Sequence, residues 1–255
     1  SHNMVSWNWK GGGSTSANSD GSTASSVSAN TTAGFSVVSY TGAGATTYGH
    51  GLGATPNVII IKKRTSDSGN NNWFVYHDKV ITAGGSNKSF LTLNETGATT
   101  ANGSATTFTS VSSTTFGVGT DDIISESSHT FIAYCFAEIK GYSKFGIYSG
   151  NNANDGTFIH TGFKPAFIIV KRTDSADDWK MVSREVEVHN PMNQSVKANS
   201  SVAEATESDH AMDLLSNGFK FRENNAAFNA AGTYVYMAWA QEPFVTSEGL
   251  PTTAL

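Results

Sequence analysis

The sequence predicts an all-β protein made of two tandem homologous domains, each a β-sandwich or jelly-roll-like unit. Three observations predict this. Charged residues are only 15% of the chain while aromatic residues are 11%, so apolar anchors alternate with small polar residues, as in short strands joined by tight turns. Runs of β-branched and aromatic residues recur between Gly, Pro, Asn and Asp. Finally, the chain repeats itself with a period of roughly 105 residues, which is long enough for a small domain.

The repeat is clearest where each unit ends. The segment Thr130–Glu138 aligns without a gap with Thr233–Gln241, and Thr115–Val118 aligns in the same register with Gly218–Phe221. Other matched features are Phe35–Gly42 with Lys144–Gly150, Gly49–Thr65 with Ile159–Thr173, His50 with His160, and Trp73 with Trp179. Two occurrences of a histidine before a shared turn indicate a structural role, since catalysis rarely needs one histidine in each repeat.

These matches set the predicted domain boundaries. Residues 34–140 form the first repeat, residues 141–245 the second, and residues 246–255 a C-terminal tail. Residues 1–33 contain a tag remnant at Ser1–His2, a strand at Val5–Lys10 with the spacing of Val235–Ala240, and a linker or long surface loop rich in Gly and Ser from Gly11 to Gly34. We interpret Val5–Lys10 as the last strand of a preceding repeat.

The strand signals fall in the same order in both repeats. The predicted strands are Phe35–Tyr40, Val58–Lys63, Trp73–His77, Phe90–Leu93, Thr115–Val118, Thr130–Ile139, Phe145–Tyr148, Phe158–His160, Phe167–Lys171, Trp179–Val182, Gly218–Phe221 and Thr233–Ala240. Val58–Ile61 and Phe167–Val170 are apolar at successive positions, which predicts burial on both faces. Only Ala203–Leu215 has the composition of a helix, with a stop at Gly218.

Composition excludes several classes of function. A net charge of −5, a pI near 5.8 and dispersed Lys and Arg argue against nucleic-acid binding. No apolar stretch approaches the roughly 20 residues that span a bilayer, so we expect no membrane insertion. The single cysteine, Cys135, lies among apolar residues and matches Ala238 of the second repeat, which predicts a buried, inert thiol.

Motifs with catalytic or ligand-binding chemistry are weak here. Gly49–Ala54 fits a dinucleotide fingerprint, but Pro56 and an apolar run follow it where a helix is required. The histidines lack metal-ligand spacing, so we expect no metal and no cofactor. Oxygen-rich runs at 151–156 and 174–178 leave Ca²⁺ open, although turn formation explains them better. The carboxylates considered as a glycosidase pair are Glu95, Asp121, Asp122 and Glu126.

Binding groups are instead expected in loops, where a rigid β scaffold usually presents recognition residues. Asparagine amides and a carboxylate concentrate in the loops Asp67–Asn72, Asn151–Gly156 and Arg222–Asn229. The candidate ligand-binding residues are Asn70, Asn71, Asn72, Asn151, Asn152, Asn154, Asp155, Asn224 and Asn225. The tryptophans Trp7, Trp9, Trp73, Trp179 and Trp239 could serve as sugar platforms, but core packing is the better interpretation for those in matched strands.

Several long phrases agree in order with a known family. Ser28–Gly42, Gly49–Pro56, Phe131–Gly146 and Leu215–Lys220 resemble a repeated β module of tail-fibre and tail-appendage proteins of tailed bacteriophages, especially marine ones. The resemblance covers nearly the whole chain. It implies an extracellular location on the virion and no catalytic residues.

The resemblance therefore implies a non-enzymatic virion structural module, used for host-surface attachment or for spacing a receptor-binding tip. Its expected partners are other tail-fibre subunits, including a homotrimer, and a host cell-surface glycan. The alternatives are a stand-alone carbohydrate-binding domain and, less favoured, a polysaccharide depolymerase.

Overall fold

The computed structural model describes residues 6–65, 69, 71–80, 89–100, 107–206 and 210–241, with only the backbone of Ala205 and Thr206. Its elements in these residues are β1 (Ser16–Asn18), β2 (Ser25–Asn30), β3 (Phe35–Thr41), β4 (Thr46–Gly49), β5 (Val58–Lys63), β6 (Trp73–His77), β7 (Leu91–Thr92), β8 (Phe108–Val111), β9 (Thr115–Val118), α1 (Asp122–Ser125), β10 (Thr130–Phe136), β11 (Ser143–Gly150), β12 (Phe158–His160), β13 (Pro165–Arg172), β14 (Lys180–Ser183), β15 (Gln194–Lys197), β16 (Ala205–Thr206), β17 (Met212–Leu215), β18 (Gly218–Phe221) and β19 (Gly232–Ala240).

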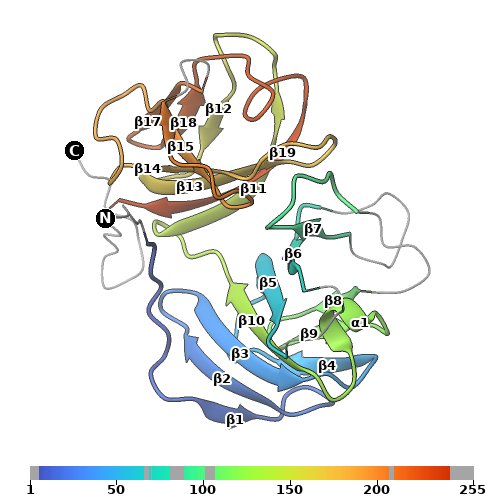
Figure 1. The fold of residues 1–255 in the computed structure, drawn as a ribbon. Coiled ribbons are helices and arrows are strands. Elements are labelled where there is room, and N and C mark those ends of the chain that lie inside the picture. Colours follow the sequence, from blue (N-terminus) through green and yellow to red (C-terminus); the bar gives the residue numbers. More distant parts are fainter. Residues whose placement is uncertain are drawn as a thin grey trace.

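The chain forms two halves, each with one large and one small antiparallel sheet (Figure 1). The first large sheet has the order β1-β2-β3-β10-β5-β6-β7 and its small sheet β4-β9-β8. The second large sheet has the order β11-β19-β13-β14-β15-β16 and its small sheet β12-β18-β17. The all-β class is therefore confirmed, and each of the twelve strands predicted within the two repeats lies within or overlaps an observed strand.

Alternation along the strands places one apolar core inside each half. On β10, Phe131, Ala133 and Cys135 face the small sheet of the first half, where they join a cluster with Tyr48 and Phe116. The second half repeats this arrangement around Tyr234, Tyr236 and Ala238 of β19. Each half is thus a two-layer β-sandwich in which short apolar and aromatic side chains fill the space between sheets.

The opposite faces of the two large sheets pack against each other. Phe136 and Val75 from the first half meet Phe167, Met237 and Trp239 from the second in a third apolar cluster. The whole molecule is therefore a stack of four layers, small sheet, large sheet, large sheet, small sheet. This explains why Val58–Ile61 and Phe167–Val170 are apolar at every position, since both faces of β5 and β13 are covered, although Ile60 stays half-buried.

Corresponding positions in the two halves make the same contacts. The backbone N–H of Trp73 donates to Oδ1 of Asn94 at 2.8 Å, and that of Trp179 donates to Oδ1 of Asn199 at 2.8 Å. The hydroxyl of Tyr40 donates to the carbonyl of Ile124 at 2.8 Å. In the second half the hydroxyl of Tyr148 donates to the carbonyl of Phe228 at 2.7 Å.

Two expectations about local structure are wrong. The expected linker between Gly11 and Gly34 contains β1 and β2, because its hydroxyl-rich residues pair with the free edge of β3, where Val27 and Ser28 become buried. Ala203–Leu215 is not a helix in its described residues; Met212–Leu215 pairs with β18 across a tight turn at Ser216–Asn217, because the sheet partner outweighs helix propensity. Neither β4, β8 nor α1 was expected.

The predicted N-terminal strand is also wrong for residues 6–10. They form no strand; instead Trp7 stacks on Phe167 with ring centroids 4.6 Å apart, and Trp9 lies 5.0 Å from Trp239. Trp7 and Trp9 are two residues apart, so in an extended segment both rings lie on the same side, toward the apolar space between the large sheets. Val5 lies outside the described residues.

Candidate functional site

A buried asparagine, Asn229, organises the loops at one end of the second half. Its Nδ2 donates to Oδ1 of Asn151 at 2.8 Å, to the carbonyl of Ala153 at 2.8 Å and to that of Glu223 at 3.2 Å. Its Oδ1 accepts from the backbone N–H groups of Asn151 and Thr157. One fully buried side chain therefore joins the loop 151–157 to the loop 222–231, and we call these two segments the polar loop cluster.

The outer surface of this cluster presents amides and charges to solvent. Asn151, Asn152, Asn154 and Asn224 are exposed. Asn152 has φ of 54°, a left-handed conformation that Asn tolerates better than most residues. Asp155 forms an ion pair with Lys220 at 2.8 Å, and the hydrogen bond from Lys220 lowers the pKa of the Asp155 carboxyl. The exposed side chains therefore project from a backbone whose position is held by the hydrogen bonds of the buried Asn229.

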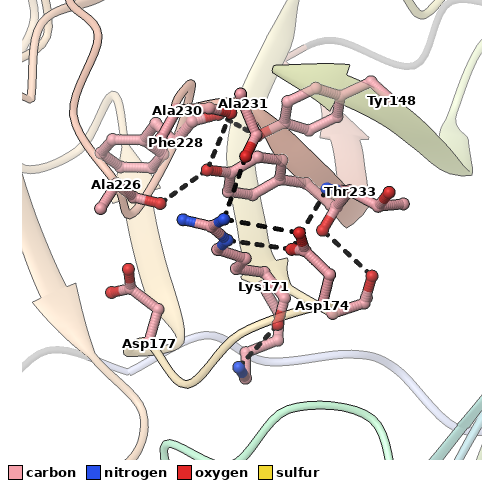
Figure 2. Close-up of polar contacts among 12 residues, drawn as sticks. Tyr148, Lys171, Asp174, Asp177, Ala226, Phe228, Ala230, Ala231 and Thr233 are labelled. Carbon is pink, nitrogen blue, oxygen red and sulfur yellow. Dashed lines mark hydrogen bonds and ion pairs between the residues drawn. The ribbon is translucent and has the colours of Figure 1, made fainter. Parts of the chain in front are cut away.

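An arginine and a tyrosine donate hydrogen bonds to backbone carbonyls of the loop 222–231, among them those of Ala226 and Ala231 (Figure 2). Nε of Arg172 donates to Asp174 at 2.9 Å, and its Nη2 donates to the carbonyl of Ala231 at 3.1 Å. The guanidinium lies 5.8 Å from the ring centre of Tyr234, whose hydroxyl donates to the carbonyl of Ala226 at 2.6 Å. The Arg172 hydrogen bond lowers the pKa of Asp174, and burial raises the pKa of Tyr234 to about 12.

The residues predicted to bind ligand fall into two places. Asn151, Asn152, Asn154, Asp155, Asn224 and Asn225 all belong to the polar loop cluster. Asn71 and Asn72 lie in the β5–β6 connection of the other half, where Asn72 accepts from Asn94 at 2.8 Å and donates to Glu95 at 2.5 Å. Asn70 lies outside the described residues.

Asn229 was not singled out from the sequence, although it ends a loop that was. Nothing in the local pattern distinguishes it from the exposed Asn224 or the half-buried Asn225, because its role depends on the approach of a loop about 75 residues earlier in the chain. Arg172 is the last residue of β13, and its contacts to Asp174 and Tyr234 were not predicted from the sequence.

Three of the four carboxylates considered for catalysis are engaged in structural contacts, while Asp122 lies in the first turn of α1. Asp121 caps α1 through Ile123 at 3.2 Å and accepts from Thr107 at 2.9 Å. Glu126 forms an ion pair with the buried Lys63, and Glu95 accepts from Asn72. In the 174–178 run, Asp174 binds Arg172 while Asp178 binds Lys197. Within the described part of the chain, no group of three or more His, Cys, Asp or Glu residues could hold a metal ion.

The thiol and the histidines also have structural surroundings. Cys135 is fully buried, as predicted, and burial raises the pKa of its thiol to about 12. The matching of His50 with His160 is wrong by one residue, since Gly49 pairs with Thr115 and His160 with Gly218. His50 is buried and its ring holds the following turn by accepting from the N–H of Leu52 at 3.3 Å, whereas His160 is exposed.

The five tryptophans all lie between the two large sheets. Trp179 and Trp239 are buried, and Trp7, Trp9 and Trp73 are half-buried. Core packing is therefore confirmed for Trp179 and Trp239. None of the five lies in the polar loop cluster, so sugar recognition there would depend on amides and charges without an indole platform.

Comparison with known protein families identifies one family that matches the chain. A family model described as a domain of unknown function, DUF7483, matches residues 1–243, and the match extends through both halves and the segment that contains Trp7 and Trp9. No curated protein and no solved structure matches the chain. No helix in the described residues is long and apolar enough to cross a membrane. The chain belongs to the DUF7483 family.

Proposed function

We propose that this chain is a non-enzymatic structural module of a tailed-phage tail appendage, built from two tandem homologous units, that contacts the host surface through its polar loop cluster. Support for the location on a virion comes from the resemblance of Ser28–Gly42, Phe131–Gly146 and the other matched phrases to tail-fibre modules. Support for recognition comes from the geometry of the loops.

The tandem relationship is supported by order and register together. Strands β3-β10-β5-β6-β7 correspond to β11-β19-β13-β14-β15, and β4-β9-β8 to β12-β18-β17. The gapless sequence alignment of β10 with β19 pairs Cys135 with Ala238, and these two residues face Ile59 and Ile168 at equivalent places. Two unrelated sandwiches would have to reach the same order, register and Trp–Asn contacts independently.

The observation that supports attachment best is the immobilised surface around Asn229. Its five side-chain hydrogen bonds hold the exposed amides of Asn151, Asn152 and Asn154 on a rigid base. Pre-ordered amides can exchange hydrogen bonds with sugar hydroxyls at a lower entropic cost than mobile ones. A single site of this kind has a Kd of about 1 mM, and several modules on one appendage would raise the avidity.

A stand-alone carbohydrate-binding domain would use the same surface, so the loop cluster favours it as the second candidate. A depolymerase is the least favoured, because glycoside hydrolysis needs two carboxyl groups roughly 5–9.5 Å apart flanking the substrate. Three of the four acids considered for that role, Glu95, Asp121 and Glu126, have structural partners in Asn72, Thr107 and Lys63, which supports binding without turnover.

The experiment is a multivalent fusion of the chain, tested against host cells and a glycan panel. Asn154→Ala combined with Asn224→Ala should reduce binding at least tenfold, while Asn217→Ala, exposed at the opposite end of the small sheet, should leave it unchanged. Absence of binding by the multivalent fusion would leave only a spacer.

Two further measurements test the rest of the proposal. Antibodies raised against the chain should label the tail appendage of intact particles, and their failure to label virions would contradict the location. Hydrolysis of any polysaccharide by the isolated chain would refute the non-enzymatic role.

A further inference from the structure

A cavity of about 450 Å³ lies between the two large sheets, away from the polar loop cluster. All five tryptophans line it. No charged side chain does so among the described residues, and the polar side chains at its wall are Asn8 and Tyr134. Its volume falls in the range of small-molecule sites, roughly 300–1,000 Å³.

The wall of the cavity comes from matched positions of the two halves. Trp73 corresponds to Trp179 and Phe136 to Trp239, and the rings of Phe136 and Trp239 meet at 5.8 Å. When two units are related by a two-fold axis, equivalent residues of the two units meet at that axis, as Phe136 and Trp239 do here. Ile60 with Ile169 and Leu93 with Ala198 are further matched pairs in the wall.

Aromatic contacts form part of the cavity wall. The rings of Phe136 and Trp239 meet at 5.8 Å, Trp7 stacks on Phe167 at 4.6 Å, and Nε1 of Trp179 donates to the carbonyl of Thr92 at 2.8 Å. Other side chains of the wall are half-buried and so reach solvent, among them Ile60, Tyr134 and Trp73, which stacks on Tyr134 at 6.2 Å; the cavity therefore has an opening beside them.

One cation lies beside this opening. Lys62 is two residues from Ile60 on β5, so it points to the same face of the sheet, and it pairs across the strands with Trp73. Its Nζ donates to the backbone carbonyl of Asn71. An acidic head group at the opening would therefore meet a positive charge, while the remainder of the ligand would meet apolar walls.

We propose that this cavity binds the single acyl chain of a fatty acid, with the carboxylate beside Lys62. A sugar or an extended peptide would bury hydroxyl or amide groups against walls that offer almost no partners, and each such group is costly to desolvate. At about 30 Å³ for a methylene-sized group, the volume accommodates roughly 12 to 15 carbon atoms. A two-chain lipid would exceed it.

Tryptophan fluorescence provides the test, because every indole of the chain is at the wall. 11-Bromoundecanoate should quench the emission in a saturable manner through contact of its bromine with the indoles, and undecanoate should compete without quenching. In a saturated series, each added methylene should raise the affinity about fourfold until roughly 12 to 15 carbons, after which the affinity should level off.

Variants distinguish binding in this cavity from non-specific hydrophobic association of the ligand with the protein. Val37→Phe inserts the residue found at the matched position Phe145, and Ala198→Phe fills the opposite wall; each should weaken undecanoate binding at least tenfold while the urea midpoint shows that the protein is folded. Lys62→Gln should weaken undecanoate but not undecanol. Phe158→Ser, which removes an exposed ring elsewhere, should change nothing.

Several results would overturn the proposal. These are no quenching by the brominated chain, affinity that rises with chain length without levelling off, or equal binding by Val37→Phe and Ala198→Phe. A concentration-dependent dimer abolished by both filling variants would assign the cavity to a second copy of the chain instead. Because these readouts do not involve the loop cluster, they are independent of the proposed attachment function.

Discussion

Asn229 shows how much of a loop arrangement can depend on one residue. Its amide is buried and all of its hydrogen-bonding groups are used, so its removal would leave the N–H groups of Asn151 and Thr157 and two carbonyls without their partner. An unpaired buried polar group costs about 1–3 kcal/mol. The exposed asparagines around it contribute to the surface chemistry, whereas Asn229 determines where that surface lies.

Asn229→Ala should therefore lower the free energy of unfolding by about 2–3 kcal/mol and reduce binding by the multivalent fusion. Asn224→Ala, at an exposed position of the same loop, should change stability by less than about 0.5 kcal/mol. Urea denaturation of both variants checks this. Equal stability of the two variants would contradict the organising role.

Cys135 should not react with thiol reagents in the native protein. Its side chain is fully buried in the first core, and burial raises the pKa of the thiol to about 12, so almost no thiolate exists at neutral pH. Labelling should appear only as the protein unfolds in urea, and its rate should follow the unfolding curve. Rapid labelling without denaturant would contradict the packing of β10.

His77 links the two halves and should make stability depend on pH. Its Nε2 faces the carbonyl of Tyr236 in the second half at 3.4 Å, and its Nδ1 lies 3.4 Å from Asp78 and accepts from the N–H of Lys79. Burial lowers the pKa of His77 to about 4, and burial likewise lowers the pKa of His210 to about 4. Both imidazoles are therefore neutral in the folded protein at pH 5 to 6.

The unfolded chain binds protons at these histidines below pH 6.5 while the folded chain does not, so stability is greatest above that pH. It should fall between pH 6.5 and 4, by up to about 1.4 kcal/mol per pH unit for each histidine. Urea midpoints across this range, compared with those of His77→Gln, test the expectation. A variant slope equal to that of the wild type would exclude His77 as a contributor.

At the scale of elements, predictability depended on how strongly the local residues specify a strand. β5 and β13 each contain four consecutive apolar residues. A run of this kind predicts a strand that is covered on both faces, so both strands were predicted. β1 and β2 consist of Ser, Ala, Asn and one valine, and they are strands because the edge of β3 offers backbone partners. β17 was expected as a helix, since its pairing with β18 depends on a turn and not on composition.

The site was predictable in part for the same reason. The exposed asparagines were found because loops rich in Asn are visible in the sequence, but their grouping into one cluster depends on Asn229 and on the distance between loops in space. The cavity was not predicted, since the residues at its wall come from ten separate segments of the chain and each is consistent with ordinary core packing.

The segment before β1 stabilises the packing between the halves. Trp9 contacts Phe136 of the first half at 5.6 Å and Trp239 of the second at 5.0 Å, so it connects both large sheets. Trp9→Ala should lower the free energy of unfolding by about 2–3 kcal/mol, somewhat less than a fully buried tryptophan. Lys10→Ala, an exposed neighbour, is the control. Deletion of residues 1–12 should lower the Tm further; an unchanged melting curve would contradict this.

At the scale of the whole molecule, the shared middle layer makes the halves depend on each other. The faces of both large sheets that contain Phe136, Val75, Phe167 and Met237 are buried only because they meet. Loop contacts add to this, with the N–H of Thr99 donating to the carbonyl of Thr173 at 2.9 Å. The two sandwiches should consequently unfold together.

Calorimetry should show a single transition with equal calorimetric and van't Hoff enthalpies, despite the two-unit architecture. Residues 16–140 expressed alone, which keep every strand of the first half, should aggregate or bind a dye for exposed apolar surface, because one face of their large sheet loses its cover. Two resolved transitions would show that each half is stable without the other.

The arrangement of Trp9 against Trp239 also determines how the module would respond to mechanical load. The first described segment lies against the last strand, and Gln241, just beyond that strand, is held by Lys164. A pull applied through both ends would therefore act across this aromatic contact and peel it open, instead of shearing the hydrogen bonds along the sheets. In the proposed tail appendage, a unit whose first described segment lies against its last strand would add little length along the fibre.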